Sequence, residues 1–152
     1  MPVFARLIFG LVNFAARNGL ATSDAPSAKL RARQTGIRGE TFAYWYLRRH
    51  GYILIARNFT VSGLKGELDL VGYDGAVLAF VEVKTRAGES KEFGSPEDAV
   101  SPDKRRLLIR MARHFLLERR IRDVPCRYDV LAIESRPGRR PLVRLHKDAF
   151  SS

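Results

Sequence analysis

The sequence predicts an α/β domain in which helices flank a mixed β-sheet. Three observations support this fold class. Residues 34–49 repeat apolar side chains at helical spacing. Asp74-Gly75 separates two segments whose side chains alternate with the period of two expected of strands. Ser101-Pro102 is typical of a helix start. The predicted order is helix, three strands, helix, two strands, which implies a mixed sheet with helices on its faces.

The first helix and the first three strands follow one another closely. Apolar side chains three and four residues apart predict a helix over 34–49, and Gly51 supplies its stop. An apolar extended run predicts a first strand over 52–60. Period-two alternation predicts strands over 67–73 and 76–86, and the Asp-Gly pair between them is typical of a two-residue hairpin loop.

The second half of the chain repeats the helix-to-strand order. A polar, glycine-containing loop is predicted over 87–95. The next helix begins at Pro102, after a serine N-cap, and runs to about Arg119 with an apolar stripe and a basic surface. Two further strands are predicted over 126–133 and 142–146.

The N-terminal region differs from the rest. We expect residues 1–28 to form an extension, amphipathic or flexible, and residues 29–152 to form one domain, with a small polar linker at 21–27. The first residues are apolar at roughly helical spacing, but Arg6 and Arg17 interrupt a run already too short to cross a bilayer. A helix packed on the domain, or a loose extension, is preferred to a membrane-surface helix.

The charge balance indicates a polyanionic partner. The 152 residues include 27 Lys and Arg against 16 Asp and Glu, which gives a formal net charge of +11. Nucleic acid is the first expectation, and a membrane partner is less favoured. A single cysteine, Cys126, and three scattered histidines exclude an internal disulfide and argue against a His/Cys metal cage. A cytoplasmic location fits this composition best.

The hairpin brings two carboxylates together. If Asp74-Gly75 forms the loop, Tyr73 pairs with Ala76 and Asp69 pairs with Phe80. Glu82 then becomes the diagonal neighbour of Asp69 on the same sheet face.

Two such carboxylates repel one another unless a cation lies between them or one takes up a proton. A hard divalent cation prefers oxygen ligands, and the Val83 carbonyl offers a third oxygen. Lys84, at the next position on the same face as Glu82, is suited to holding a water or stabilising a phosphate. Glu40 is placed to reach in from the first helix as a further ligand or as a base. The pattern therefore predicts metal-dependent phosphodiester hydrolysis.

Structural alternatives remain open for these residues. Alternating Glu and Lys on a strand is commonly a solvated face, and the alternative for Glu40 is an ion pair with Arg38 or Arg57. Glu67 is expected to be an outer neighbour rather than a ligand. Arg57, Arg86 and Lys104 are predicted to contact the phosphates of the substrate, Lys104 because it lies in the first turn of a helix.

Five motifs, in this order and spacing, resemble the YraN-like family of small bacterial proteins. They are G-x-R-G-E (36–40), Y-x-L-x-A-R-N (52–58), G-E-L-D-L-V (66–71), F-V-E-V-K-T-R (80–86) and R-Y-D-V (127–130). That family is similar in turn to the PD-(D/E)xK nucleases, especially archaeal Holliday-junction resolvases.

The resemblance implies a restriction-endonuclease-like fold and a set of functional residues. The helix carboxylate of the nucleases falls on Glu40, their metal-binding Asp on Asp69, and their E-x-K pair on Glu82 and Lys84. Glu40, Asp69 and Glu82 are therefore the expected metal ligands. The resemblance implies Mg²⁺- or Mn²⁺-dependent cleavage of branched or duplex DNA. It also implies, by analogy with resolvases, a homodimer.

Two other functions compete with the nuclease. A non-catalytic basic nucleic-acid-binding module on the same fold would retain binding without cleavage. A membrane-surface protein would bind lipid through the N-terminal helix. Asp69→Ala separates the first two, because it removes metal-dependent cleavage and leaves binding intact or tighter if the nuclease prediction is right.

Overall fold

The computed structural model describes residues 2–17, 27–87 and 99–152. Apart from residues 27 and 87, the predicted linker (21–27) and polar loop (87–95) lie outside these ranges. The chain divides into two compact units, each described by itself. Unit 1 comprises Met1–Gly51, Val83–Glu92 and Leu131–Leu145, and unit 2 comprises Tyr52–Glu82, Phe93–Val130 and His146–Ser152.

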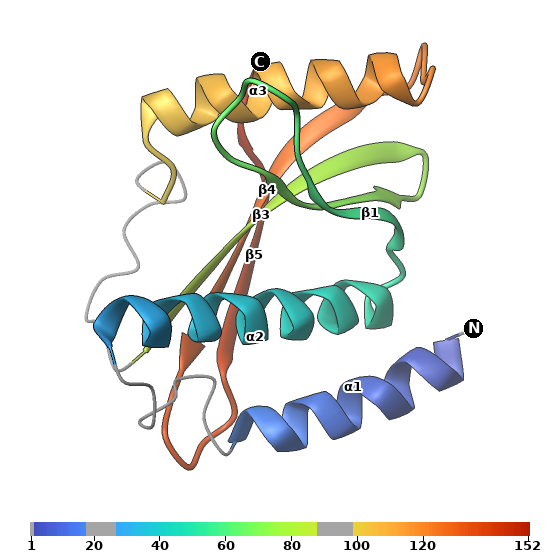
Figure 1. Ribbon diagram of the computed structural model, residues 1–152. Coiled ribbons are helices and arrows are strands. Elements are labelled where there is room, and N and C mark those ends of the chain that lie inside the picture. Colours follow the sequence, from blue (N-terminus) through green and yellow to red (C-terminus); the bar gives the residue numbers. More distant parts are fainter. Residues whose placement is uncertain (1, 18–26, 88–98) are drawn as a thin grey trace. The chain divides into compact units, whose positions relative to one another are not determined.

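The helices and strands follow the predicted order. The elements are α1 (Pro2–Arg17), α2 (Ala28–Arg49), β1 (Ile53–Phe59), β2 (Leu68–Asp74), β3 (Val77–Ala87), α3 (Pro102–Glu118), β4 (Cys126–Ser135) and β5 (Leu142–Phe150). The five strands form one mixed sheet in the order β1-β2-β3-β4-β5 (Figure 1). The predicted fold class, a restriction-endonuclease-like α/β fold with a mixed sheet and flanking helices, is confirmed.

Helix α2 begins earlier than the prediction. It starts at Ala28 rather than at residue 34, because the Ser27 side chain caps it and accepts a hydrogen bond of 3.2 Å from the Leu30 backbone N–H. The predicted linker therefore ends in a helix cap. The C-terminal end agrees with the prediction, and Gly51 follows with a φ of +90°.

The β2–β3 hairpin has a different loop from the predicted one. Asp74 pairs with Val77, so the loop is Gly75-Ala76 rather than Asp74-Gly75, and the ladder is shifted by two residues. Gly75 has a φ of +61°, a conformation that glycine adopts without steric cost. The predicted register, with Tyr73 opposite Ala76, was therefore wrong.

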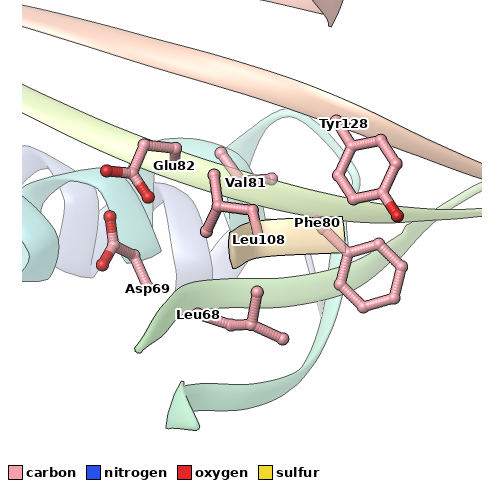
Figure 2. A pocket seen from close by; sticks show the side chains of 7 residues that line it. All are labelled: Leu68, Asp69, Phe80, Val81, Glu82, Leu108 and Tyr128. Carbon is pink, nitrogen blue, oxygen red and sulfur yellow. The ribbon is translucent and has the colours of Figure 1, made fainter. Parts of the chain in front are cut away.

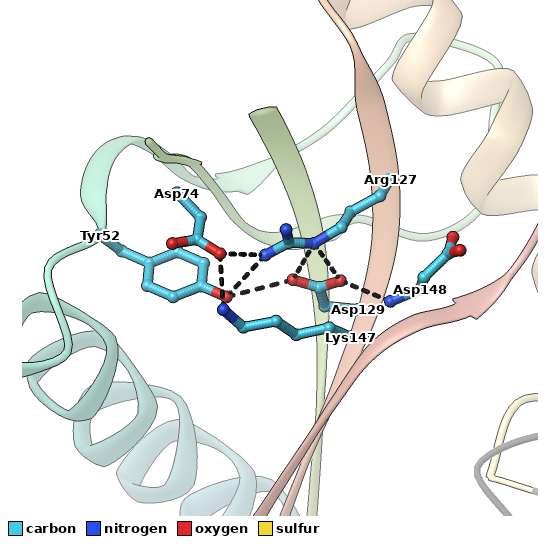
Figure 3. A network of polar contacts seen from close by, with 6 residues as sticks. All are labelled: Tyr52, Asp74, Arg127, Asp129, Lys147 and Asp148. Carbon is cyan, nitrogen blue, oxygen red and sulfur yellow. Dashed lines mark hydrogen bonds and ion pairs between the residues drawn. The ribbon is translucent and has the colours of Figure 1, made fainter. Parts of the chain in front are cut away.

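A polar network in unit 2 explains why Asp74 remains in the strand. Its carboxylate accepts hydrogen bonds from Arg127 Nη2 at 2.5 Å and from Lys147 Nζ at 2.6 Å. Arg127 Nε also donates to Asp129 at 2.8 Å, and Tyr52 Oη donates to the same carboxylate at 3.3 Å (Figure 3). The network joins β2, β4 and β5 to the residue that precedes β1.

The core of unit 2 lies between α3 and the sheet. The apolar face of α3 buries Leu108, Met111 and Phe115. The Phe115 ring packs edge-on against Phe59 and Phe80, with ring centroids 5.0 and 6.0 Å apart. These large buried rings supply much of the driving force for folding this unit and fix α3 on the sheet.

In unit 1, α1 packs on α2 through Phe9. The Phe9 ring centroid lies 5.4 Å from that of Phe42 and 5.9 Å from that of Tyr46. Helix α2 approaches β3 closely at Gly39, where a Cβ atom would lie 1.8 Å from Thr85 Oγ1. Among the described residues, none of the helices has the length and apolarity needed to cross a membrane.

Candidate active site

Asp69 and Glu82 face one another across the β2–β3 pair. Leu70 pairs with Val81, and one further step along this antiparallel ladder places Asp69 opposite Glu82. Figure 2 shows the two carboxylates pointing toward each other. The prediction that they lie on adjacent strands and on one face holds. The predicted pairing of Asp69 with Phe80 was wrong, and the two-residue shift makes the carboxylates direct rather than diagonal neighbours.

Both carboxylates are nearly removed from solvent. Asp69 is 8% exposed and Glu82 is 5% exposed. They border a small pocket with a mainly apolar lining. Its other lining residues are Leu68, Phe80, Val81, Leu108 and Tyr128 (Figure 2). Charges in such surroundings interact more strongly than charges in water, and their burial is costly unless a cation compensates it.

Glu67 adds a third carboxylate, which the sequence interpretation underestimated. One of its carboxylate oxygens lies within 4.8 Å of one from Asp69. The proximity of Glu67 to Asp69 could have been predicted from the sequence, because side chains two residues apart in an extended segment lie on the same face. Glu67 was expected to be an outer neighbour; its side chain is instead partly buried beside Asp69.

Lys104 brings a positive charge to this acidic group. Its Nζ lies 3.4 Å from Glu82 Oε1, and its side chain is 28% exposed. The start of α3 positions it, because Ser101 Oγ accepts a hydrogen bond of 3.3 Å from the Lys104 backbone N–H and Pro102 occupies the first helical turn. Lys104 was predicted as a phosphate contact, and in the structure its ammonium group lies against a carboxylate.

The acidic group has the donor chemistry of a site for a hard divalent cation. Glu67 and Asp69 offer carboxylate oxygens within 4.8 Å of one another, and Glu82 adds another carboxylate opposite Asp69. Mg²⁺ and Mn²⁺ prefer such oxygen ligands. Lys104 offsets one of the three formal negative charges, and a divalent cation would offset the other two. Glu67 and Asp69 therefore belong to a group of acidic side chains that could hold a metal ion.

Two further predicted residues belong to unit 1. Glu40 lies on α2 and is partly buried. Lys84 lies on β3, is also partly buried, and follows Glu82 by two residues, so that strand alternation gives both the same face of β3.

The predicted phosphate contacts Arg57 and Arg86 are both exposed. Arg57 lies on β1 and pairs with Leu70, the residue that follows Asp69. Its Nε donates a hydrogen bond of 3.2 Å to the Asn58 side chain. Arg86 lies near the end of β3, in unit 1.

Helix α3 carries an additional basic surface on the side away from the core. Arg106, Arg110 and Arg113 are exposed and follow one another at four- and three-residue spacing, so they share one helix face. The buried residues of α3, among them Leu108 and Met111, occupy the opposite face. We call Arg106, Arg110 and Arg113 the α3 arginine row.

Comparison with known proteins shows that the region containing these residues matches a protein family. The model of the uncharacterised protein family UPF0102 matches residues 39–133, which include Glu40, Glu67, Asp69, Glu82, Lys84 and Lys104. The chain is 42% identical over 118 residues to a UPF0102 protein of Koribacter versatilis, covering 77% of this chain and 79% of the relative. It is 43% identical over 119 residues to one of Symbiobacterium thermophilum, covering 78% and 98%.

A UPF0102 protein of Herminiimonas arsenicoxydans is 45% identical over 105 residues, covering 68% of this chain and 81% of the relative. The chain therefore belongs to the UPF0102 family, and the resemblance to YraN-like proteins is confirmed. The matched region begins at Gly39, so that α1 lies outside it.

Proposed function

We propose that this UPF0102 protein is a metal-dependent endonuclease that hydrolyses phosphodiester bonds in DNA. The observation that carries the proposal is the direct opposition of two buried carboxylates, Asp69 and Glu82, on adjacent strands. Such a pair is unfavourable without compensating positive charge; Lys104 supplies part of it, and a bound divalent cation would supply the rest. A polyanionic substrate suits a chain with a net charge of +11.

We assign the metal ligands to Asp69, Glu82 and Glu67, with Glu40 as a further ligand or a base. Their carboxylate oxygens suit Mg²⁺ or Mn²⁺. When bound, such an ion supplies a water of lowered pKa and positive charge for the phosphate oxygens.

The lysines have two separate roles in this proposal. Lys84 holds a water or stabilises the charge that develops on the phosphate in the transition state. Lys104 is a positioning residue, since its ion pair with Glu82 at 3.4 Å fixes the direction of that carboxylate. A phosphate bound beside Glu82 would meet the positive charge of Lys104.

The proposed substrate is branched or duplex DNA, held through its backbone. Arg57, Arg86 and the α3 arginine row are exposed cations suited to phosphate contacts. A homodimer would allow both strands of a symmetric junction to be cut, and we expect the protein to act in the cytoplasm.

The deciding experiment measures cleavage of labelled branched and linear DNA with Mn²⁺, Mg²⁺ or EDTA. We expect the wild type to cut only with metal. Asp69→Asn and Lys84→Ala should each lower the cleavage rate by about 10²-fold or more while retaining DNA binding. Asp123→Asn, an exposed carboxylate in the α3–β4 connection, is the matched control and should cut like the wild type.

Two results would count against the nuclease. Equal cleavage by the wild type and Asp69→Asn would show a contaminating activity. Salt-sensitive DNA binding without cutting in any metal would favour the alternative function, a non-catalytic nucleic-acid-binding module on the same fold.

A further inference from the structure

Helix α1 exposes a continuous apolar stripe. Its residues lie three or four positions apart, apart from one adjacent pair at the N-terminal end, and so line one side of the helix. They are Val3, Phe4, Leu7, Leu11 and Phe14, each between 64% and 74% exposed. Five large apolar side chains this exposed on one short helix are unusual for a surface that faces only water.

Among the described residues of unit 1, other side chains of α1 make the packing contacts. Ala5, Phe9 and Ala16 are buried, and Phe9 contacts the rings of Phe42 and Tyr46 on α2. At 100° per residue, these three positions fall on the side of α1 opposite the stripe. Helix α1 is thus apolar on two opposite faces, and α2 covers only one of them.

The charged residues of α1 itself are all positive. Helix α1 contains Arg6 and Arg17 and no acidic residue. The first twelve residues of α2 also lack Asp and Glu, and Lys29, Arg33 and Arg38 are exposed there. A surface that covers the stripe should therefore be apolar in its interior and negatively charged at its boundary.

We propose that α1 docks on the surface of an anionic lipid bilayer. The stripe inserts at the boundary between headgroups and acyl chains, while Arg6 and the cations of α2 attract the acidic headgroups. Helix α1 lies in the plane of the membrane, and its Phe9 face stays on α2. The membrane was the less favoured partner in the sequence interpretation, and the exposure of the stripe is the observation that changes this expectation.

A second copy of the chain fits the stripe less well. A helix of 16 residues offers little more than two heptads, which is short for a stable coiled coil. Facing copies would also place arginine near arginine, with no acidic residue on α1 to pair with either.

The test is flotation of the full chain with lipid vesicles. Vesicles of phosphatidylcholine with about a third phosphatidylglycerol should bind the protein, whereas pure phosphatidylcholine should bind it much less, and added salt should weaken the binding. Replacing Leu7 and Leu11 together with Gln should reduce the partition coefficient at least tenfold, an order-of-magnitude expectation for losing two buried leucines. Both sites are exposed, so an unchanged melting temperature will show that the variant folds.

The matched control replaces Ile53 and Leu117 with Gln, since these aliphatic side chains are 67% and 77% exposed in unit 2. This control should bind vesicles like the wild type. The proposal is overturned if the wild type binds neither vesicle, or if the Leu7/Leu11 variant binds as well as the wild type. Self-association of the wild type that the Leu7/Leu11 variant loses, without vesicle binding, would overturn it in favour of a second copy. None of these readouts depends on DNA cleavage.

Discussion

Lys104 on α3 forms an ion pair with Glu82 on β3, with 3.4 Å between Nζ and Oε1. The Glu82 side chain is only 4% exposed, so this lysine compensates a nearly buried negative charge. The pair joins the helix start to the strand that carries the acidic group.

Lys104→Gln should therefore destabilise the metal-free protein by about 1–3 kcal/mol. Excess Mn²⁺ should reduce this deficit, because a cation at the acidic group replaces the lost positive charge. Thermal unfolding with and without Mn²⁺ measures both effects. Arg106→Gln, which removes a surface ion pair with Asp103, should change stability little in either condition. A Lys104→Gln deficit that is the same with and without metal would contradict the proposed ion site.

Glu67→Gln should weaken metal binding, because it removes a charged oxygen donor next to Asp69. We expect the Mn²⁺ concentration for half-maximal cleavage to rise by about tenfold or more. A metal titration of cleavage measures this value. Glu118→Gln, an exposed carboxylate at the end of α3, is the control. If both variants match the wild type, Glu67 is not a ligand.

Asp74→Asn should change the dependence of stability on pH. Hydrogen bonds from Lys147 and Arg127 hold the pKa of Asp74 below its ordinary value of 3.8. A depressed folded-state pKa adds stability that is present above the ordinary value and is lost as the pH falls through the lower one. The variant should lose about 1–2 kcal/mol at pH 7, and its difference from the wild type should shrink below about pH 4. Urea unfolding at pH 7 and pH 3 tests this, and a constant difference would refute it.

Gly39→Ala should destabilise the protein although alanine favours helices. The new Cβ would lie 1.8 Å from Thr85 Oγ1 and 2.8 Å from Thr85 Cβ, so α2 or β3 must shift. We expect a net loss of about 1–3 kcal/mol in the free energy of unfolding. Gly36→Ala on the same helix meets nothing within 4 Å and should stabilise by up to about 1 kcal/mol. Equal effects at the two glycines would exclude a close α2–β3 approach.

Neutralising the α3 arginine row should weaken DNA binding in a salt-dependent way. Each of Arg110→Gln and Arg113→Gln should lower the slope of log affinity against log salt by roughly 1, if each arginine neutralises one phosphate. Fluorescence anisotropy over a range of salt concentrations measures the slope. Arg139→Gln in the exposed β4–β5 turn is the control. An unchanged slope in both α3 variants would show that the DNA does not contact the α3 arginine row.

The order of elements could be predicted because each has a strong local pattern. Strand alternation identified the hairpin, and the Ser-Pro pair identified the start of α3 at Pro102. The start of α2 was missed because Ser27 lies in a polar segment typical of a linker. Only the backbone N–H of Leu30 shows that this serine is a cap.

The sequence predicted which residues form the candidate site better than it predicted how they are arranged. Asp69 and Glu82 could be paired from alternation alone, but their register depended on which residues formed the loop. Asp74 stays in β2 through contacts with Arg127 and Lys147, more than fifty residues away in the sequence, and a local turn pattern cannot contain that information. The ion pair of Lys104 with Glu82 depends in the same way on the packing of α3.

The Gly75-Ala76 loop also constrains how the hairpin can change over evolutionary time. Twelve residues lie between Asp69 and Glu82, and side chains alternate along both strands. Substitutions at the tip can be tolerated, but inserting or deleting one residue there would turn one of the two carboxylates to the opposite side of the sheet. We therefore expect the length of this hairpin to be as invariant among relatives as its acidic residues, even though its tip lies at the far end from them.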